Sequence, residues 1–203
     1  MDLAVIFQDF LETVATRTAD VARNSDPITE DTLCFYIAAS FMTAGHTPPH
    51  LVEMEIPHPA FKKEKGMQKA CDVRVFDGSN SVWLEVKFDK EPPSKAAMNM
   101  TNRHGKLVND LMRTASIPNG DRLFLYVTTT TMLGHLARND NPYLGNKKFM
   151  IDGQYVEGLP KSAKSEVKDY VLTELGSRKV TVEPLHQGTR GHLRCFLYGV
   201  SRS

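Results

Sequence analysis

The clearest chemistry in this sequence comes from three ionisable residues on two neighbouring predicted strands, namely Asp72, Glu85 and Lys87. In the segment 82–88 (VWLEVKF), apolar residues alternate with Trp83, Glu85 and Lys87, which is the two-residue period of a β-strand. Successive side chains of a strand point to opposite faces, so Glu85 and Lys87 are predicted to share one face.

The preceding segment 71–76 (CDVRVF) alternates in the same way, and the turn sequence DGSN joins the two as a predicted hairpin. A four-residue loop sets Asp72 directly across from Glu85, whereas a loop two residues longer sets it across from Lys87. Either register groups the three side chains, with Arg74 beside them. The opposite, apolar face of this strand is predicted to hold Cys71, Val73 and Val75.

The pairing of two carboxylates with a lysine predicts a metal site. Carboxylates at cross-strand distance repel each other unless a positive charge lies between them, and their hard oxygens suit Mg²⁺ or Mn²⁺. Such an ion activates a water and neutralises charge on a phosphate, and a nearby lysine stabilises the developing negative charge. Asp72 and Glu85 are therefore the predicted metal ligands, and Lys87 the predicted catalytic cation of phosphodiester hydrolysis. The alternative is an exposed salt bridge worth less than ~1 kcal/mol.

The same tripeptide occurs a second time as Glu166-Val167-Lys168. That copy lies in a polar stretch with helical spacing, where positions i and i+2 do not share a face. We interpret it as a solvated helix surface. The copy at Glu85 differs because it lies on an apolar strand, faces Asp72 and is followed by a predicted helix.

The order of these residues and elements resembles the PD-(D/E)xK superfamily of restriction-endonuclease-like nucleases. Asp72 is followed by a turn and then by Glu85-Val86-Lys87, with a predicted helix before the hairpin and a helix and a strand after it. The resemblance covers roughly residues 28–130. It implies an α/β fold with an αβββαβ core, a mixed central sheet flanked by helices, and here an extra C-terminal helix and strands over about 131–203. The sequence departs from the family pattern at Cys71, which stands in place of a proline.

The resemblance also implies site residues on two helices. In that superfamily the helix before the hairpin often supplies an acid, and Glu30 occupies the matching place; an acid in a first helical turn is also explained by the helix dipole alone. The helix after the second strand often adds a polar residue, for which Lys106 is the candidate. The implied activity is that of a Mg²⁺- or Mn²⁺-dependent endonuclease, with DNA the expected substrate and a restriction or defence system the expected setting.

Basic residues around the hairpin are candidates for holding a phosphate backbone. They lie in the loop before the first hairpin strand, beside the site, and on the outward face of the following helix, with Asn109, Asp110 and Arg113. A solvated basic surface is the alternative interpretation for each. The nucleic-acid-binding candidates are Lys62, Lys63, Lys65, Arg74, Arg103 and Lys106.

Hydrophobic periodicity predicts the elements that position this hairpin within one domain of 203 residues. Helical spacing predicts helices over 2–22, from an N-cap at Thr29 to about Thr43, over 94–115 and over 162–176. Two-residue alternation predicts strands at LVEMEI (51–56), within 121–129, and at RKVTVEPL and HLRCFLYGV near the C-terminus.

Composition narrows the class of protein. Apolar residues make up 41% and charged residues 24%, which is typical of a globular chain, and a net charge of +1 excludes a histone-like protein. The three cysteines lie far apart without zinc spacing, so we expect a reducing, cytoplasmic location. The N-terminus lacks the basic region of a signal peptide, and no stretch approaches the ~18 apolar residues of a membrane span.

Three functions remain open from the sequence. The first is the metal-dependent nuclease, and the second is a catalytically inactive nucleic-acid-binding or scaffold protein with the same fold; metal dependence separates the two. The third is a hydrolase of small nucleotides, which would need a closed pocket rather than an open groove. Whether the nucleic acid is DNA or RNA also stays open. So does a homodimer, which is common among enzymes that cut both strands.

Overall fold

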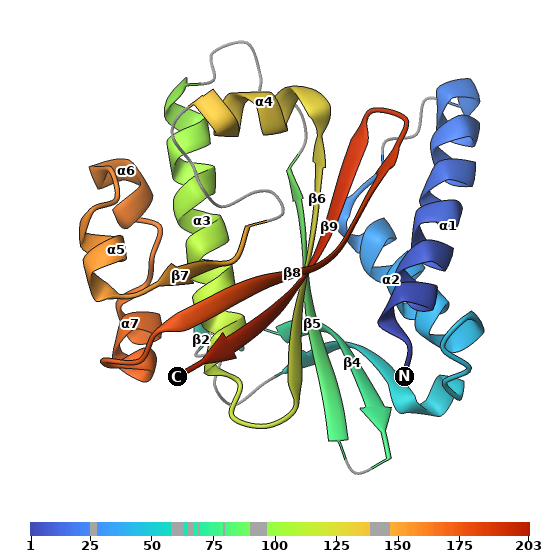
Figure 1. The fold of residues 1–203 in the computed structure, drawn as a ribbon, viewed down its shortest axis with the longest axis horizontal. Helices are drawn as coiled ribbons and strands as arrows, with labels where there is room; N and C mark the ends of the chain where they lie inside the picture. The colour runs from blue at the N-terminus through green and yellow to red at the C-terminus, as the bar shows by residue number, and fades with distance from the viewer. Residues whose placement is uncertain are drawn as a thin grey trace.

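The protein has three layers, with helices on both faces of a mixed β-sheet (Figure 1). The computed structural model describes residues 1–24, 28–57, 63–64, 67–68, 70–78, 80–89, 97–138 and 147–203. In this part of the chain the main sheet has seven strands in the order β1-β4-β5-β6-β9-β8-β7. No helix in the described ranges is long and apolar enough to cross a membrane.

The main sheet joins the hairpin region to the C-terminal strands. Among the strands of the described ranges only β5 and β6 pair in parallel, and α3 makes the crossover between them. Strand β9 then pairs antiparallel with β6, so the C-terminal part of the chain extends the same sheet. The strands are β1 (Val52–Pro57), β4 (Ala70–Asp77), β5 (Asn80–Asp89), β6 (Asp121–Thr129), β7 (Phe149–Ile151), β8 (Val180–Arg190) and β9 (Leu193–Arg202), and β2 (Lys63–Glu64) and β3 (Met67–Gln68) form a separate two-stranded sheet.

The helices divide between the two faces of the sheet (Figure 1). Helices α1 and α2 cover one face, α3 and the short helices α5 to α7 lie on the other, and α4 follows β6. As predicted, Thr29 caps α2, because its side-chain oxygen accepts a hydrogen bond from the backbone N–H of Thr32. The helices are α1 (Leu3–Asn24), α2 (Glu30–Thr43), α3 (Ala97–Ser116), α4 (Thr130–Arg138), α5 (Gly153–Glu157), α6 (Lys161–Lys164) and α7 (Asp169–Leu175), with a 3-10 turn η1 at Pro49–Leu51.

Each face of the sheet buries its own apolar core. Phe10 of α1 and Leu33 of α2 pack on Leu84 of β5, whose alternating apolar face was predicted. On the other side, Leu111 of α3 packs with Phe124 of β6. Because both faces of β5 and β6 are covered, Glu85, Asp89 and Thr128 of these strands are buried rather than on an exposed sheet face.

The helix predicted over 162–176 is wrong as a single element. It is divided into α6 and α7, and Val167 between them is buried. The side chain of Asn109 on α3 accepts a hydrogen bond from the backbone N–H of Lys168 at 3.0 Å, which holds the connection against the neighbouring helix. Asn109 and Arg113 were both predicted to face outward, yet both are buried. The second Glu-x-Lys copy therefore lies in a connection between helices.

A close approach between helices depends on Gly105 of α3. A Cβ atom at this position would overlap the backbone carbonyl of Ala163 on α6. We predict that Gly105→Ala lowers the free energy of unfolding by about 1–3 kcal/mol, because backbone atoms cannot move aside as a side chain can. Urea unfolding measures the change.

The matched control for this prediction is Gly134→Ala in α4, where an added Cβ meets nothing within 4 Å. That variant is expected to gain about 0.5–1 kcal/mol from helix propensity. Equal stability changes for the two variants would contradict the close packing of α3 on α6.

Candidate active site

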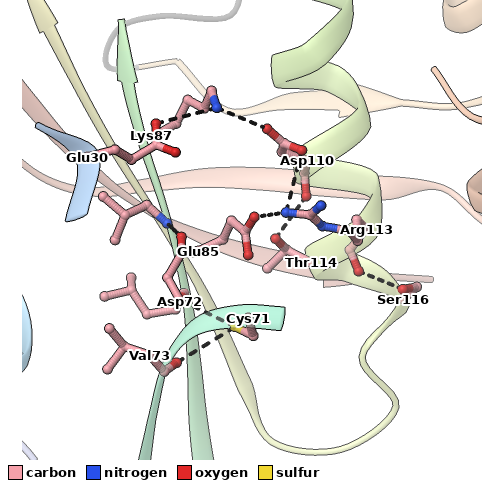
Figure 2. A network of polar contacts seen from close by, with 12 residues as sticks. Glu30, Cys71, Asp72, Val73, Glu85, Lys87, Asp110, Arg113, Thr114 and Ser116 are labelled. Atoms are coloured by element: carbon pink, nitrogen blue, oxygen red, sulfur yellow. Dashed lines mark hydrogen bonds and ion pairs between the residues drawn. The ribbon is translucent and has the colours of Figure 1, made fainter. Parts of the chain in front are cut away.

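Strands β4 and β5 pair in the register predicted for the four-residue loop. Val73 pairs with Leu84, and Asp77 pairs with Asn80. The ladder ends at Val73, and beyond it an oxygen of the Asp72 carboxylate accepts a hydrogen bond from the backbone N–H of Val86 at 2.6 Å (Figure 2). Asp72 therefore binds the β5 backbone at the point where β4 and β5 separate.

The alternation predicted for β4 is wrong at Cys71. Val73 and Val75, the other residues of the predicted apolar face, lie in the core below α1 and α2, but Cys71 packs with Trp83 and Ile117 on the α3 side. Its thiol donates a hydrogen bond to the backbone oxygen of Leu84 at 3.3 Å. The adjacent strand β1 is irregular at the same level, where Glu55 has a left-handed φ of 54°. This local break lets Cys71 change faces.

Burial and neighbouring acids make Asp72 hard to ionise. Burial raises the pKa of Asp72 to about 7, while the hydrogen bond from the Val86 N–H opposes that rise. The carboxylate of Glu30 raises this pKa further, the guanidinium of Arg113 lowers it, and Glu55 adds a smaller increase. A cation bound here would favour the ionised form of Asp72.

Glu85 is almost fully buried, with 4% of its surface exposed, and is held by Arg113. One carboxylate oxygen, Oε1, forms an ion pair with Nη2 of Arg113, which reaches across from α3 (Figure 2). The other oxygen, Oε2, is buried and has no hydrogen-bond partner among the residues that the structure describes. A buried carboxylate oxygen without a partner raises the free energy of the folded protein. A cation would therefore be stabilised beside Oε2 of Glu85.

Lys87 lies between two carboxylates from different helices. Its Nζ is 3.4 Å from Oε2 of Glu30 on α2 and 3.7 Å from Oδ2 of Asp110 on α3. Burial alone lowers the pKa of Lys87, but the charges of Asp110 and Glu30 outweigh burial and raise it above its ordinary value. Lys87 is therefore a cation at neutral pH, suited to stabilising negative charge rather than to accepting a proton.

Glu30 reaches the hairpin from the first turn of α2. Besides contacting Lys87, its Oε2 accepts a hydrogen bond from the backbone N–H of Phe88 at 2.8 Å. The structure therefore brings together Glu30, Asp72, Glu85 and Lys87, the four residues to which the sequence analysis gave catalytic roles (Figure 2). The contacts with Lys87 and Phe88, in addition to the dipole of α2, therefore explain an acid at position 30.

Three further charged residues join this cluster. Asp110 and Arg113 come from α3, where Nη2 of Arg113 also lies 3.6 Å from Oδ1 of Asp110. Asp89 continues the β5 alternation beyond Lys87; it is 7% exposed and accepts a hydrogen bond from the Tyr126 hydroxyl at 2.9 Å. The alternation of β5 extended by one step would have found Asp89. Asp110 and Arg113 carried no such signal, because charged residues on a helix usually face water.

Arg74 is already paired within the sheet. Its Nε donates a hydrogen bond to Oε2 of Glu53 on β1 at 2.7 Å. Its guanidinium also lies 4.3 Å from the ring centre of Phe76 and 5.0 Å from that of Trp83. These contacts hold Arg74 against its own strand neighbours.

The other predicted nucleic-acid-binding residues are placed unevenly. Nη1 of Arg103 lies 3.9 Å from Oδ1 of Asp89, so Arg103 borders the charged cluster. Lys106 is exposed, and the α3 residues in contact with Lys87 and Glu85 are instead Asp110 and Arg113. Three lysine candidates have no described side chain: Lys62 and Lys65 lie outside the described residues, and Lys63 is described only as part of β2.

A ready-made cage for a metal ion is absent from the described ranges, where no group of three or more His, Cys, Asp or Glu side chains is arranged to hold one. The two predicted ligands nevertheless fit a hard cation, because Glu85 has a buried oxygen with no partner among the described residues and Asp72 is a half-buried carboxyl among other acids. Mg²⁺ commonly uses only one or two carboxylates together with water and phosphate oxygens.

Comparison with known proteins finds no match among family models, curated proteins or solved structures. Function is therefore inferred from the residues of the site. Those residues are Asp72 and Glu85, with Lys87 and Glu30 beside them.

The Glu85–Arg113 ion pair predicts a large stability effect. Arg113→Met leaves the Glu85 carboxylate buried without its partner and is expected to lower the free energy of unfolding by about 3–5 kcal/mol. Glu85→Met combined with Arg113→Met removes both charges and is expected to cost less than Arg113→Met alone. Urea unfolding measures both variants.

The control is Arg178→Met, which changes an exposed arginine and is expected to alter stability by less than about 0.5 kcal/mol. If Arg113→Met behaved like this control, Arg113 would not be compensating the buried charge of Glu85.

Proposed function

We propose that this protein is a Mg²⁺- or Mn²⁺-dependent nuclease that hydrolyses phosphodiester bonds, with DNA as its substrate. The observation that carries the proposal is the gathering of two carboxylates, the half-buried Asp72 and the buried Glu85, and the cationic Lys87 where β4 and β5 separate. Hydrolysis of a phosphodiester needs such groups, because negative charge develops on the phosphate.

Asp72 and Glu85 would hold the ion. The buried, unpartnered Oε2 of Glu85 and the acid-rich surroundings of Asp72 support this assignment. When bound, a divalent cation supplies Lewis acidity, which activates a water and neutralises charge on the phosphate.

The remaining residues of the cluster position the reacting groups and stabilise negative charge. Lys87 presents a protonated amine that stabilises the developing negative charge, and Glu30 and Asp110 keep it charged and in place. Arg113 fixes the orientation of the Glu85 carboxylate through its ion pair. Glu30 also ties α2 to the β5 backbone at Phe88, which holds Lys87 and Glu30 in register.

The order of the elements supports a restriction-endonuclease-like core. Helix α2, strands β1, β4 and β5, helix α3 and strand β6 follow one another along the chain as αβββαβ. Within the sheet these strands are neighbours in the order β1-β4-β5-β6, with β5 and β6 parallel. The αβββαβ order and the mixed sheet support the core that the PD-(D/E)xK resemblance of Asp72, Glu85 and Lys87 implies.

A second candidate is a catalytically inactive nucleic-acid-binding or scaffold protein with the same fold. The observation that favours it is the ion pair of Arg113 with Glu85, since Arg113 already supplies the positive charge that this carboxylate needs. In that protein Arg113 would replace the cation permanently, and added metal would not change its stability.

Cleavage of plasmid DNA and single-stranded RNA with Mg²⁺, Mn²⁺ or EDTA tests the proposal. The native chain is expected to cut DNA only with the metal. Asp72→Ala is expected to abolish cutting because it removes a ligand, and Lys87→Ala to slow it by about 10²–10³-fold because it removes charge stabilisation. Gel electrophoresis over time measures the rates.

The chain provides a matched control in its second Glu-x-Lys copy. Lys168→Ala removes an exposed lysine from the same tripeptide and is expected to cut at the native rate. Metal-independent cutting, or native rates in the Asp72 and Lys87 variants, would assign any activity to another site. No cutting by the native chain under any condition would favour the inactive binding protein.

A further inference from the structure

The hairpin of β8 and β9 lies at the same end of the sheet as the charged cluster. In Figure 1 its tip rises beside the ends of β5 and β6. The register agrees, because Leu193 at the start of β9 pairs with Thr129 at the end of β6. The turn between the strands includes Gly191, whose φ of 57° is readily adopted by glycine.

One row of paired residues links the cluster to this hairpin. Asp89 of β5 pairs with Thr128 of β6, and Thr128 pairs with Arg194 of β9. Residues paired in this way point to the same face of a sheet, so Arg194 is on the face of Asp89, Glu85 and Lys87. Two strand spacings, roughly 10 Å, separate Asp89 from Arg194, and four residues of β5, roughly 13 Å, separate Asp89 from Glu85. Arg194 is therefore roughly 16 Å from Glu85, about five nucleotides at 3.4 Å of duplex axis each.

The contacts of Arg194 are with neutral oxygens. Its Nε donates to Oγ1 of Thr130 at 3.3 Å, and its Nη1 donates to Oγ1 of Thr189. Among the described residues no carboxylate is within ion-pairing distance of Arg194, in contrast to Arg74, which is paired with Glu53. The Thr130 hydroxyl itself donates to the backbone oxygen of His192 at 3.2 Å. The positive charge of Arg194 and the Thr189 hydroxyl beside it therefore remain available to an anion.

We propose that Arg194 and Thr189 form a phosphate subsite that holds the nucleic-acid backbone about five nucleotides from the cleaved bond. An arginine flanked by hydroxyl groups is a common set of phosphate contacts. This inference deepens the proposed function and rests on it for the position of the cleaved bond. It also gives a role to the C-terminal strands, which the resemblance to a nuclease core did not cover.

Arg190 on the same hairpin is a matched control for Arg194. Its Nη1 donates to the backbone oxygen of Thr189 at 2.9 Å, so it too contacts a neutral oxygen. However, Arg190 pairs with Leu193, which packs in the core below α1 and α2. Arg190 is therefore on the opposite face of the sheet and is not expected to contact the same strand of nucleic acid.

Binding without cleavage tests the subsite. The native chain, Arg194→Gln and Arg190→Gln are titrated into a fluorescein-labelled DNA duplex in EDTA at several salt concentrations, and fluorescence anisotropy gives each Kd. Arg194→Gln is expected to weaken binding about tenfold and to lower the salt slope by about 1, the loss of one phosphate contact. Arg190→Gln is expected to bind as the native chain does.

Arg194→Lys separates charge from packing. It keeps the charge, so it is expected to retain the native salt slope even where the lost hydrogen bonds weaken binding. Native affinity in Arg194→Gln, equal losses in both glutamine variants, or no binding by the native chain would each overturn the subsite. If binding depends on Arg194 but no metal-dependent cutting occurs, the subsite is supported and the nuclease is rejected. If metal-dependent cutting occurs but Arg194→Gln binds DNA as the native chain does, the nuclease is supported and the subsite is rejected.

Discussion

The withdrawal of two neighbouring carboxylates from water, the half-buried Asp72 and the buried Glu85, is the constraint on which the rest of the site depends. Carboxylates removed from water cost free energy unless they are neutralised or paired. Here the Val86 N–H binds Asp72, and Arg113 binds Glu85. One oxygen of Glu85 is left without a partner, so the compensation within the described residues is incomplete.

The fold explains why these charges can be assembled at all. The parallel pairing of β5 with β6 requires a crossover, and α3 makes it directly above the polar face of β5. Asp110 and Arg113 thereby reach Lys87 and Glu85 from one side, while α2 brings Glu30 from the other. Lys87 is thus held by acids from two helices on opposite faces of the sheet. Its raised pKa follows from that arrangement.

Much of this site could be predicted from local patterns. The alternation of β5 and the short turn before it gave the correct register and brought Glu85 to the face that carries Lys87. The predictions that were wrong concern residues whose positions depend on contacts between distant segments. Cys71 changes faces because β4 leaves the ladder at Asp72, and Arg113 turns inward because a buried carboxylate lies opposite it. Neither contact leaves a periodic signal in its own segment.

Mn²⁺ binding measured by isothermal titration calorimetry tests the central claim most directly, because it requires neither a substrate nor turnover. The native chain is expected to bind the ion, and Asp72→Asn and Glu85→Gln to bind it at least about tenfold more weakly. Glu166→Gln, in the second Glu-x-Lys copy, is expected to bind as the native chain does. Absence of binding by the native chain, or equal affinity in all four proteins, would contradict a metal site at Asp72 and Glu85.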